Sequence, residues 1–251
     1  MGILDALKRR REEESAVRTQ ELSTEPSIVT VAHHGSAIGL RREFAERYVI
    51  LHRNVFPGVL ARIRESNIRN YSIFLGGGRL FAHYEYIGKD YPGDMAAMGD
   101  PITKDWWKLT DPMQSPIRGR KKGEWWAAAT LLGHFGGDVH TGGNNVRGCL
   151  RTVSGVRAGE RGKRILDAHR PAISVVLRRY GFRNVGVYHV GGWIHCYFEH
   201  SAPDLSAASN ALVSTEEFRS VMEEFRGLVH GGGKKGNALL WESMSEVFHT
   251  D

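Results

Sequence analysis

Residues 43–86 read EFAERYVILHRNVFPGVLARIRESNIRNYSIFLGGGRLFAHYEY, and residues 157–200 read RAGERGKRILDAHRPAISVVLRRYGFRNVGVYHVGGWIHCYFEH. The second stretch can be laid on the first without a gap, at an offset of 114 residues from residue 43 to residue 157. Similar residues then coincide along both stretches: Glu46 with Glu160, Arg47 with Arg161, Pro57 with Pro171, Ile63 with Leu177, Arg64 with Arg178, Asn70 with Asn184, Phe74 with Tyr188, and Glu85 with Glu199. Self-similarity at a fixed offset indicates a duplicated structural unit.

Each copy has the pattern of an α+β unit that begins with a strand and a helix. Residues 27–34 and 144–153 are rich in β-branched residues, which predicts a strand at each place. In the helix that follows, apolar residues recur at steps of three and four, as on one buried face. Pro57 and Pro171 interrupt the two helices at the same position, so each helix is expected to kink or to restart as a second short helix.

A hairpin, a second helix and a closing strand complete each copy. In the first copy the hairpin turns at the glycines of residues 76–78, the helix carries Trp106 and Trp107, and the closing strand lies near 126–132. The resulting order, βαββαβ, is that of a ferredoxin-like unit, in which helices cover one face of an antiparallel sheet. Two such units in tandem predict an intrachain pseudo-dimeric α+β barrel. Two independent domains remain the alternative.

The chain divides into three predicted segments. Residues 1–26 form a charge-dense arm with little to bury. Residues 27–137 form the ferredoxin-like unit with the candidate active site, and residues 138–251 form a degenerate second unit. A length of 251 residues with 41% apolar residues suffices for a full core.

Composition also narrows the classes of function. The net charge is +6, but the basic residues are scattered and no nucleic-acid-binding motif accompanies them, so we expect no nucleic-acid partner. Two cysteines provide no disulfide framework, and no apolar run resembles a signal peptide or a membrane span. We therefore expect a cytoplasmic protein with no membrane contact.

The two copies differ at four positions that can carry chemistry. Polar or aromatic residues of the first copy align with apolar or unrelated residues of the second: His52 with Leu166, Tyr71 with Val185, Trp106 with Phe218, and Trp107 with Arg219. Adjacent helical residues point about 100° apart, so the two indoles cannot both enter one core. An arginine is a poor substitute for a core residue, because an unpaired guanidinium is costly to bury. We infer that Trp106 serves the core and that Trp107 lines a cleft.

The stretch LHRNVFPGVLARIRESNIRNYSIFLGGGRLFAHYEY, followed by DWWKLTDPM, resembles the L-rhamnose mutarotase family. The resemblance spans roughly residues 28–135, with a weaker echo over about 145–249. Members of this family are small dimeric α+β barrel proteins, so the tandem copy resembles a fused dimer. The resemblance implies that His52 is the catalytic acid/base, that Tyr71 is a second acid/base or a hydroxyl-binding group, and that Trp106, Trp107 and Glu85 bind the sugar.

The implied chemistry suits these residue types. Opening a pyranose hemiacetal removes a proton from the anomeric hydroxyl and gives one to the ring oxygen, and no cofactor is needed. An imidazole with an ordinary pKa of about 6.5 can take either role near neutrality. A phenol can donate or accept at the opposite edge, while an indole covers the C–H face of a sugar. Because Glu85 recurs as Glu199, a structural ion pair or hydrogen bond is a competing interpretation.

Other interpretations stay open. The chain has Pro57-Gly58 where the family usually has Pro-Glu, and the same barrel can host a cyclase, a lyase, a cofactor-free oxygenase of secondary metabolism, or a non-catalytic binding protein. In each case the partner is a small molecule: a sugar or a polyhydroxylated or cyclic metabolite. Association of the pseudo-dimer into a further homodimer stays open.

Metal ligand types are present without a recognised spacing. His33, His34, His134, Asp138 and His140 supply imidazoles and a carboxylate, but their positions match no known metal motif. We therefore predict neither a metal nor a cofactor.

Overall fold

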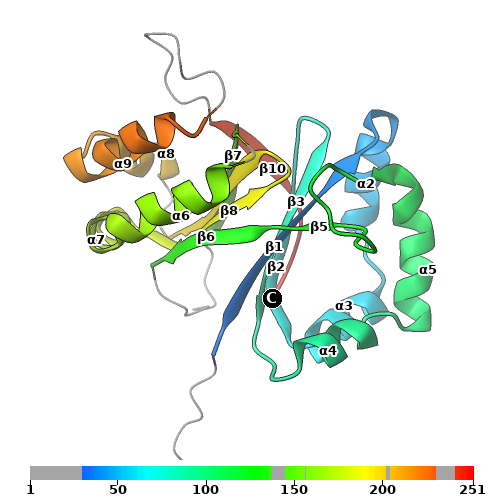
Figure 1. Ribbon diagram of the computed structural model, residues 1–251. Coiled ribbons are helices and arrows are strands. Elements are labelled where there is room, and N and C mark those ends of the chain that lie inside the picture. Colours follow the sequence, from blue (N-terminus) through cyan, green and yellow to red (C-terminus); the bar gives the residue numbers. More distant parts are fainter. Residues whose placement is uncertain (1–29, 137–144, 156, 202–203, 230–240) are drawn as a thin grey trace, which may run out of the picture. The chain divides into compact units, whose positions relative to one another are not determined.

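The computed structural model describes residues 30–136, 145–155, 157–201, 204–229 and 241–251. Residues Val31–Asp251 form one compact unit that contains both copies (Figure 1). The predicted arm, and the predicted division between residues 137 and 138, lie outside the described residues. Within the described part of the chain, no helix is long and apolar enough to cross a membrane.

The first copy has the predicted order of elements, with its long helix divided at Pro57. Its elements are β1 (Ala32–Leu40), η1 (Arg42–Phe44), α2 (Ala45–His52), α3 (Pro57–Glu65), β2 (Ile68–Gly76), β3 (Arg79–Tyr86), α4 (Tyr91–Ala97), α5 (Pro101–Thr110), η2 (Asp111–Met113), β4 (Gln114–Ser115), β5 (Ala127–Ala128) and β6 (Thr130–Phe135). Pro57 begins α3, where its missing N–H costs no hydrogen bond. The predicted restart of this helix is confirmed.

The second copy repeats this order. Its elements are β7 (Val146–Val153), α6 (Ala158–Ala168), α7 (Arg170–Arg179), β8 (Phe182–Val190), β9 (Trp193–His200), α8 (Leu205–Val213), α9 (Glu216–Arg226) and β10 (Glu242–Thr250). Pro171 lies in the first turn of α7, so the interruption is the same in both copies.

Strand register shows how closely the copies match. In the first hairpin Ile68 pairs with Tyr86, and the register shifts between Arg69 and Ser72. The second hairpin shifts at the equivalent place, between Arg183 and Gly186. Each bulge contains an asparagine with positive φ, which Asn tolerates better than most residues. These are Asn70, with φ 48°, and Asn184, with φ 46°.

The closing strands cross between copies and close the barrel. The strand order is β4-β1-β3-β2-β10-β7-β9-β8-β6, and β5 pairs with β1. Thus β10 of the second copy pairs with β7 over Glu242–Met244 and then with β2 of the first copy. Reciprocally, β5 pairs with β1, while β6, one residue further on, pairs with β8. The two copies form an intrachain pseudo-dimeric α+β barrel, and the alternative of independent domains is wrong.

Three apolar cores follow from this arrangement. One lies between the first copy's strands and α2–α5, and the second lies between the other strands and α6–α9 (Figure 1). The third fills the barrel between the two sheet halves, with Phe74, Phe81, Tyr188 and Tyr197 among its buried side chains. Residues that alternate along a strand therefore face either the helices or the barrel interior.

Two predictions about local structure need correction. The first strand was expected at 27–34 but begins at Ala32 and runs to Leu40, because its partner in the sheet is the whole of β3. The closing strand was expected near 126–132, and so to include Trp126, but it begins at Ala127. The Trp125 indole instead donates to Gln114 Oε1 over 2.8 Å, and Trp126 packs on the first copy's core.

Candidate functional site

His52 is the last residue of α2 and is held by its own helix. Its Nδ1–H donates to the carbonyl oxygen of Tyr48 over 2.9 Å, which leaves Nε2 as the unprotonated nitrogen of the neutral ring. The imidazole also stacks on the Tyr48 ring, with centroids 3.9 Å apart. Only 8% of the residue is exposed. Burial lowers the pKa of His52 to about 4, so the ring is neutral near pH 7.

Of the two indoles, Trp106 accompanies His52. Its ring lies edge-on to the imidazole with centroids 5.2 Å apart, and edge-on to Phe56 at 5.3 Å. Trp106 is buried in the first copy's core, whereas Trp107, the next residue of α5, is 39% exposed. A helix of this kind presents adjacent side chains to different surroundings, because successive residues point about 100° apart.

Tyr71 on β2 faces the same helices and is linked to His52 through Phe248. The Phe248 ring centroid lies 5.5 Å from that of Tyr71 and 6.0 Å from that of His52. Burial raises the pKa of Tyr71 to about 12, so its hydroxyl keeps its proton at neutral pH. Phe248 belongs to β10, so the second copy completes the surroundings of both candidate catalytic residues.

Further polar groups adjoin Tyr48. Burial raises the pKa of the Tyr48 phenol well above its usual value, and the nearby Tyr71 adds to that rise, whereas the Gln114 side chain opposes it. Burial also raises the pKa of Asp111, which precedes Gln114 by three residues in η2. The His52 surroundings therefore combine one imidazole, two phenols, an amide and a carboxyl group.

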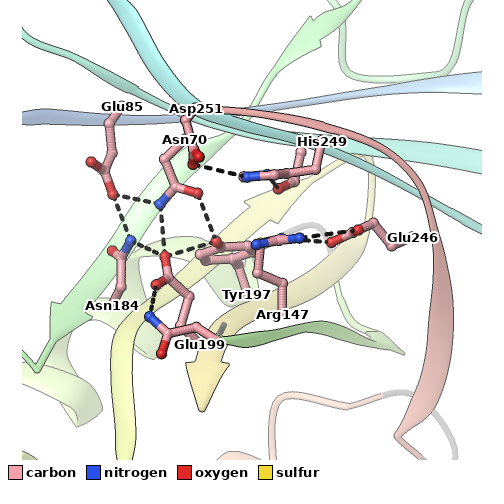
Figure 2. A network of polar contacts seen from close by, with 11 residues as sticks. Asn70, Glu85, Arg147, Asn184, Tyr197, Glu199, Glu246, His249 and Asp251 are labelled. Atoms are coloured by element: carbon pink, nitrogen blue, oxygen red, sulfur yellow. Dashed lines mark hydrogen bonds and ion pairs between the residues drawn. The ribbon is translucent and has the colours of Figure 1, made fainter. Parts of the chain in front are cut away.

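Glu85 does not join this group, although the resemblance assigned it to sugar binding. Its side chain enters the barrel interior, where Asn70 Nδ2 donates to its Oε1 over 2.8 Å and Asn184 Nδ2 donates to the same atom over 2.5 Å (Figure 2). Both amides also donate to Glu199 Oε1, each over 2.7 Å. The hydrogen-bonded interpretation of the repeated glutamates is the one that agrees with this geometry.

The barrel interior also gathers imidazoles that the sequence spacing left unconnected. His33 on β1 pairs in register with Glu85 on β3, and His83 precedes Glu85 by two residues on the same face. Potential ligand atoms of these three residues lie within 4.8 Å of one another. A His-x-Glu alternation on a strand was the available signal, but it required knowledge of which strand lies beside it. Asp138 and His140 lie outside the described residues.

In the second copy, the position equivalent to the His52 site is an apolar cavity of about 530 Å³. It lies between the strands and the helices, and its lining includes the four residues that replace the candidate site: Leu166, Val185, Phe218 and Arg219. Most of the other lining side chains are aliphatic or aromatic. In the second copy, a hollow therefore lies where the first copy has its imidazole and phenol.

The first copy is similar to a known protein family. Residues 33–132 match the L-rhamnose mutarotase family model. The resemblance inferred from the sequence is confirmed over this range, which includes His52, Tyr71 and both indoles. A search of curated protein sequences found no significant match.

Solved structures support the fold. A provisionally assigned monooxygenase of Lactobacillus acidophilus NCFM superposes with a TM-score of 0.51 and 8% identity, covering 88% of this chain and 95% of its own. Another, from Fusobacterium nucleatum subsp. nucleatum, gives a TM-score of 0.53 and 7% identity over 88% of this chain and 94% of its own. At such identities the likeness concerns the fold alone.

Proposed function

We propose that the first copy is a cofactor-independent, mutarotase-like isomerase that interconverts the pyranose anomers of a 6-deoxy sugar such as L-rhamnose. The family match over residues 33–132 supports the reaction class. The observation that carries the proposal is the hydrogen bond from His52 Nδ1–H to the Tyr48 carbonyl oxygen. That bond fixes the tautomer in which Nε2 can accept a proton.

The two candidate catalytic residues have complementary protonation states. His52 is neutral at pH 7, so its Nε2 can accept the proton of the anomeric hydroxyl. Tyr71 keeps its proton, so its hydroxyl can donate to the ring oxygen. Ring closure would reverse both transfers, and neither step needs a metal or a redox cofactor.

Aromatic rings surround these groups. The faces of Trp106 and Phe248 can cover the C–H surface and the methyl group of a 6-deoxy sugar. Trp107, which is 39% exposed, is proposed as a further contact for the sugar. Glu85 is not part of this proposal, because it faces the barrel interior, where it accepts hydrogen bonds from Asn70 and Asn184.

Saturation-transfer NMR of the anomeric protons of L-rhamnose tests the proposal. The chain is expected to accelerate exchange between the anomers, and His52→Gln is expected to reduce the catalysed rate by about 10² to 10⁴-fold. Tyr71→Phe should lower it as well. His169→Gln serves as the control, since His169 lies in the turn between α6 and α7 and bonds Glu224 over 2.6 Å. Exchange no faster than in buffer, or exchange unchanged in His52→Gln, would refute the proposal.

The second copy's cavity favours a second function, the binding of an apolar small molecule. About 530 Å³ lined by aliphatic and aromatic side chains is within the usual range for a small-molecule site. We propose that this hollow holds a hydrophobic ligand without catalysing its conversion, since an aliphatic Leu166 replaces the imidazole.

The dye 1-anilinonaphthalene-8-sulfonate is a suitable probe of this cavity. Its fluorescence is expected to rise on binding, and Val185→Trp should abolish the rise by filling the space. Val153→Trp, at an exposed strand end, is the size-matched control. Equal dye binding by the wild type and Val185→Trp would place the dye elsewhere and argue against this second function.

A further inference from the structure

Three ligand-bearing side chains meet inside the barrel on two neighbouring strands. His33 of β1 stands directly opposite Glu85 of β3 in the antiparallel register. His83 shares the strand and the face of Glu85. Their potential ligand atoms lie within 4.8 Å of one another, close enough to contact one ion after small side-chain adjustments.

His83 provides an independent observation that points to a ligand. The residue is fully buried, and its Nδ1 makes a 2.9 Å hydrogen bond with the Tyr188 hydroxyl. Its Nε2 is also buried, and among the described residues it has no hydrogen-bond partner. A buried polar atom without a partner costs about 1 to 3 kcal/mol. A bound ion would remove that cost, and the bond at Nδ1 would orient the ring as such bonds do for metal-ligating histidines.

The carboxylate is oriented by fixed donors. Glu85 Oε1 accepts from both Asn70 and Asn184, which hold the group in place across the barrel (Figure 2). Glu199 accepts from the same two amides, so two acidic side chains lie close together in a buried setting. A divalent cation beside Glu85 would offset the repulsion between them.

A third imidazole adjoins the three. The His134 ring stacks on His33, with centroids 3.7 Å apart. Its Nε2–H donates to Asn184 Oδ1 over 2.8 Å, since the amide nitrogen of Asn184 is engaged by the glutamates. His33 is therefore packed on one face by a ring that is itself hydrogen-bonded to the asparagine pair.

The second copy offers an internal comparison. At the positions equivalent to His33 and His83 it has Arg147 and Tyr197, while the glutamate is retained as Glu199. The guanidinium of Arg147 forms an ion pair with Glu246 over 2.8 Å (Figure 2). Because this arginine supplies a permanent positive charge, the second copy needs no external cation there. In the first copy, His33 stands in place of Arg147 and His83 in place of Tyr197, so that permanent charge is absent.

We propose that His33, His83 and Glu85 bind a divalent transition-metal ion inside the barrel. Two imidazole nitrogens and one carboxylate oxygen suit ions of borderline softness such as Zn²⁺, Co²⁺, Fe²⁺ or Ni²⁺. Three protein ligands leave coordination positions for water or another small ligand. This site is separate from the His52 surroundings, which lie on the opposite, helix-facing side of the sheet.

Cobalt and zinc titrations of the full chain test this site. After treatment with a chelator, the chain is expected to bind one Zn²⁺ in calorimetry and to give visible absorption bands with Co²⁺ that report nitrogen and oxygen ligands. His83→Gln and Glu85→Gln should each weaken Zn²⁺ binding at least 10-fold. His169→Gln, at the turn between α6 and α7, should leave it unchanged.

A variant that preserves all three ligands guards against loss of folding. Tyr188→Phe removes only the hydroxyl that bonds His83 Nδ1, and it is expected to weaken Zn²⁺ binding about 10-fold with an unchanged circular dichroism spectrum. The proposal is overturned if neither Zn²⁺ nor Co²⁺ binds. It is equally overturned if the folded His83→Gln, Glu85→Gln and Tyr188→Phe variants bind Zn²⁺ as the wild type does.

Discussion

Phe248, in the last strand of the chain, packs against His52, with ring centroids 6.0 Å apart, although 196 positions separate them in the sequence. The contact exists because β10 leaves its own copy after Met244 and pairs with β2 of the other. The candidate catalytic histidine therefore depends on a strand from the copy that lacks the candidate catalytic residues.

Removing this ring should affect stability and activity together. Phe248→Ala deletes a buried aromatic side chain and is expected to lower the free energy of unfolding by about 3 kcal/mol. It should also reduce anomeric exchange, because Tyr71 and His52 both lose a packing surface. Urea denaturation and NMR exchange measure the two effects. Phe182→Ala, in the second copy's core, should lower stability similarly while a folded sample retains its exchange rate; equal loss of exchange in both variants would contradict the assignment.

Acid should weaken the fold through His52. Its pKa is about 4 when folded, below the ordinary value of about 6.5, so the unfolded chain takes up a proton first as the pH falls. The contribution of His52 to the free energy of unfolding is therefore at its maximum above about pH 6.5. It falls by roughly 3 kcal/mol as the pH is lowered to 4. His52→Gln should flatten the dependence of unfolding free energy on pH in that window. A His52→Gln curve parallel to that of the wild type would contradict the assigned shift.

The asparagine pair at the barrel centre should be costly to disturb. Asn70→Ala removes the two hydrogen bonds that this amide donates to the buried carboxylates, and it places alanine at a φ of 48°. Chemical denaturation is expected to show a free energy of unfolding lower by about 3 kcal/mol. Asn54→Ala is the matched control, because Asn54 is exposed and donates only to a helix carbonyl, at 3.1 Å from Ile50 O. Its cost should be within about 0.5 kcal/mol. Similar costs for both would argue against the network.

Arg151 links the two copies and should be sensitive to loss of charge. Its guanidinium donates to the Gly76 carbonyl over 2.6 Å, pairs with Glu242 and lies over the Trp193 ring at 4.5 Å. Arg151→Met is expected to destabilise the chain by about 2 kcal/mol in thermal or urea unfolding. By comparison, Lys108→Met breaks an exposed pair with Asp105 and should cost less than about 0.5 kcal/mol. A cost that small for Arg151→Met would show that the link contributes little.

Much of the fold was predictable because the sequence contains two copies of each element, so each predicted helix or strand could be checked against its counterpart. Pro57 and Pro171 located the break in each long helix, and the βαββαβ order led to the barrel. The beginning of the first strand was misplaced, since β-branched residues before Ala32 carry a local preference, whereas the strand's extent is set by pairing with β3.

The candidate site was predictable in part. Differences between the copies singled out His52 and Trp106, which the structure brings into contact. Glu85 was grouped with them because no local signal states which face of a strand turns toward the helices. The sequence named His33 as a ligand type but did not group it with His83 and Glu85 for a related reason: their proximity depends on cross-strand register, which spacing along the chain does not encode.

Fusion of the copies has an evolutionary consequence. An ordinary homodimer must carry every substitution twice, at symmetry-related places. A substitution that is favourable in one subunit is therefore also imposed on the other. In a single polypeptide each half mutates alone: His33 could arise without a second histidine opposite it, and Arg147 could take that mirrored place. The reciprocal strand exchange holds the two halves together while their buried polar residues diverge. Gene duplication can in this way allow the two halves of a once symmetric barrel to take different roles.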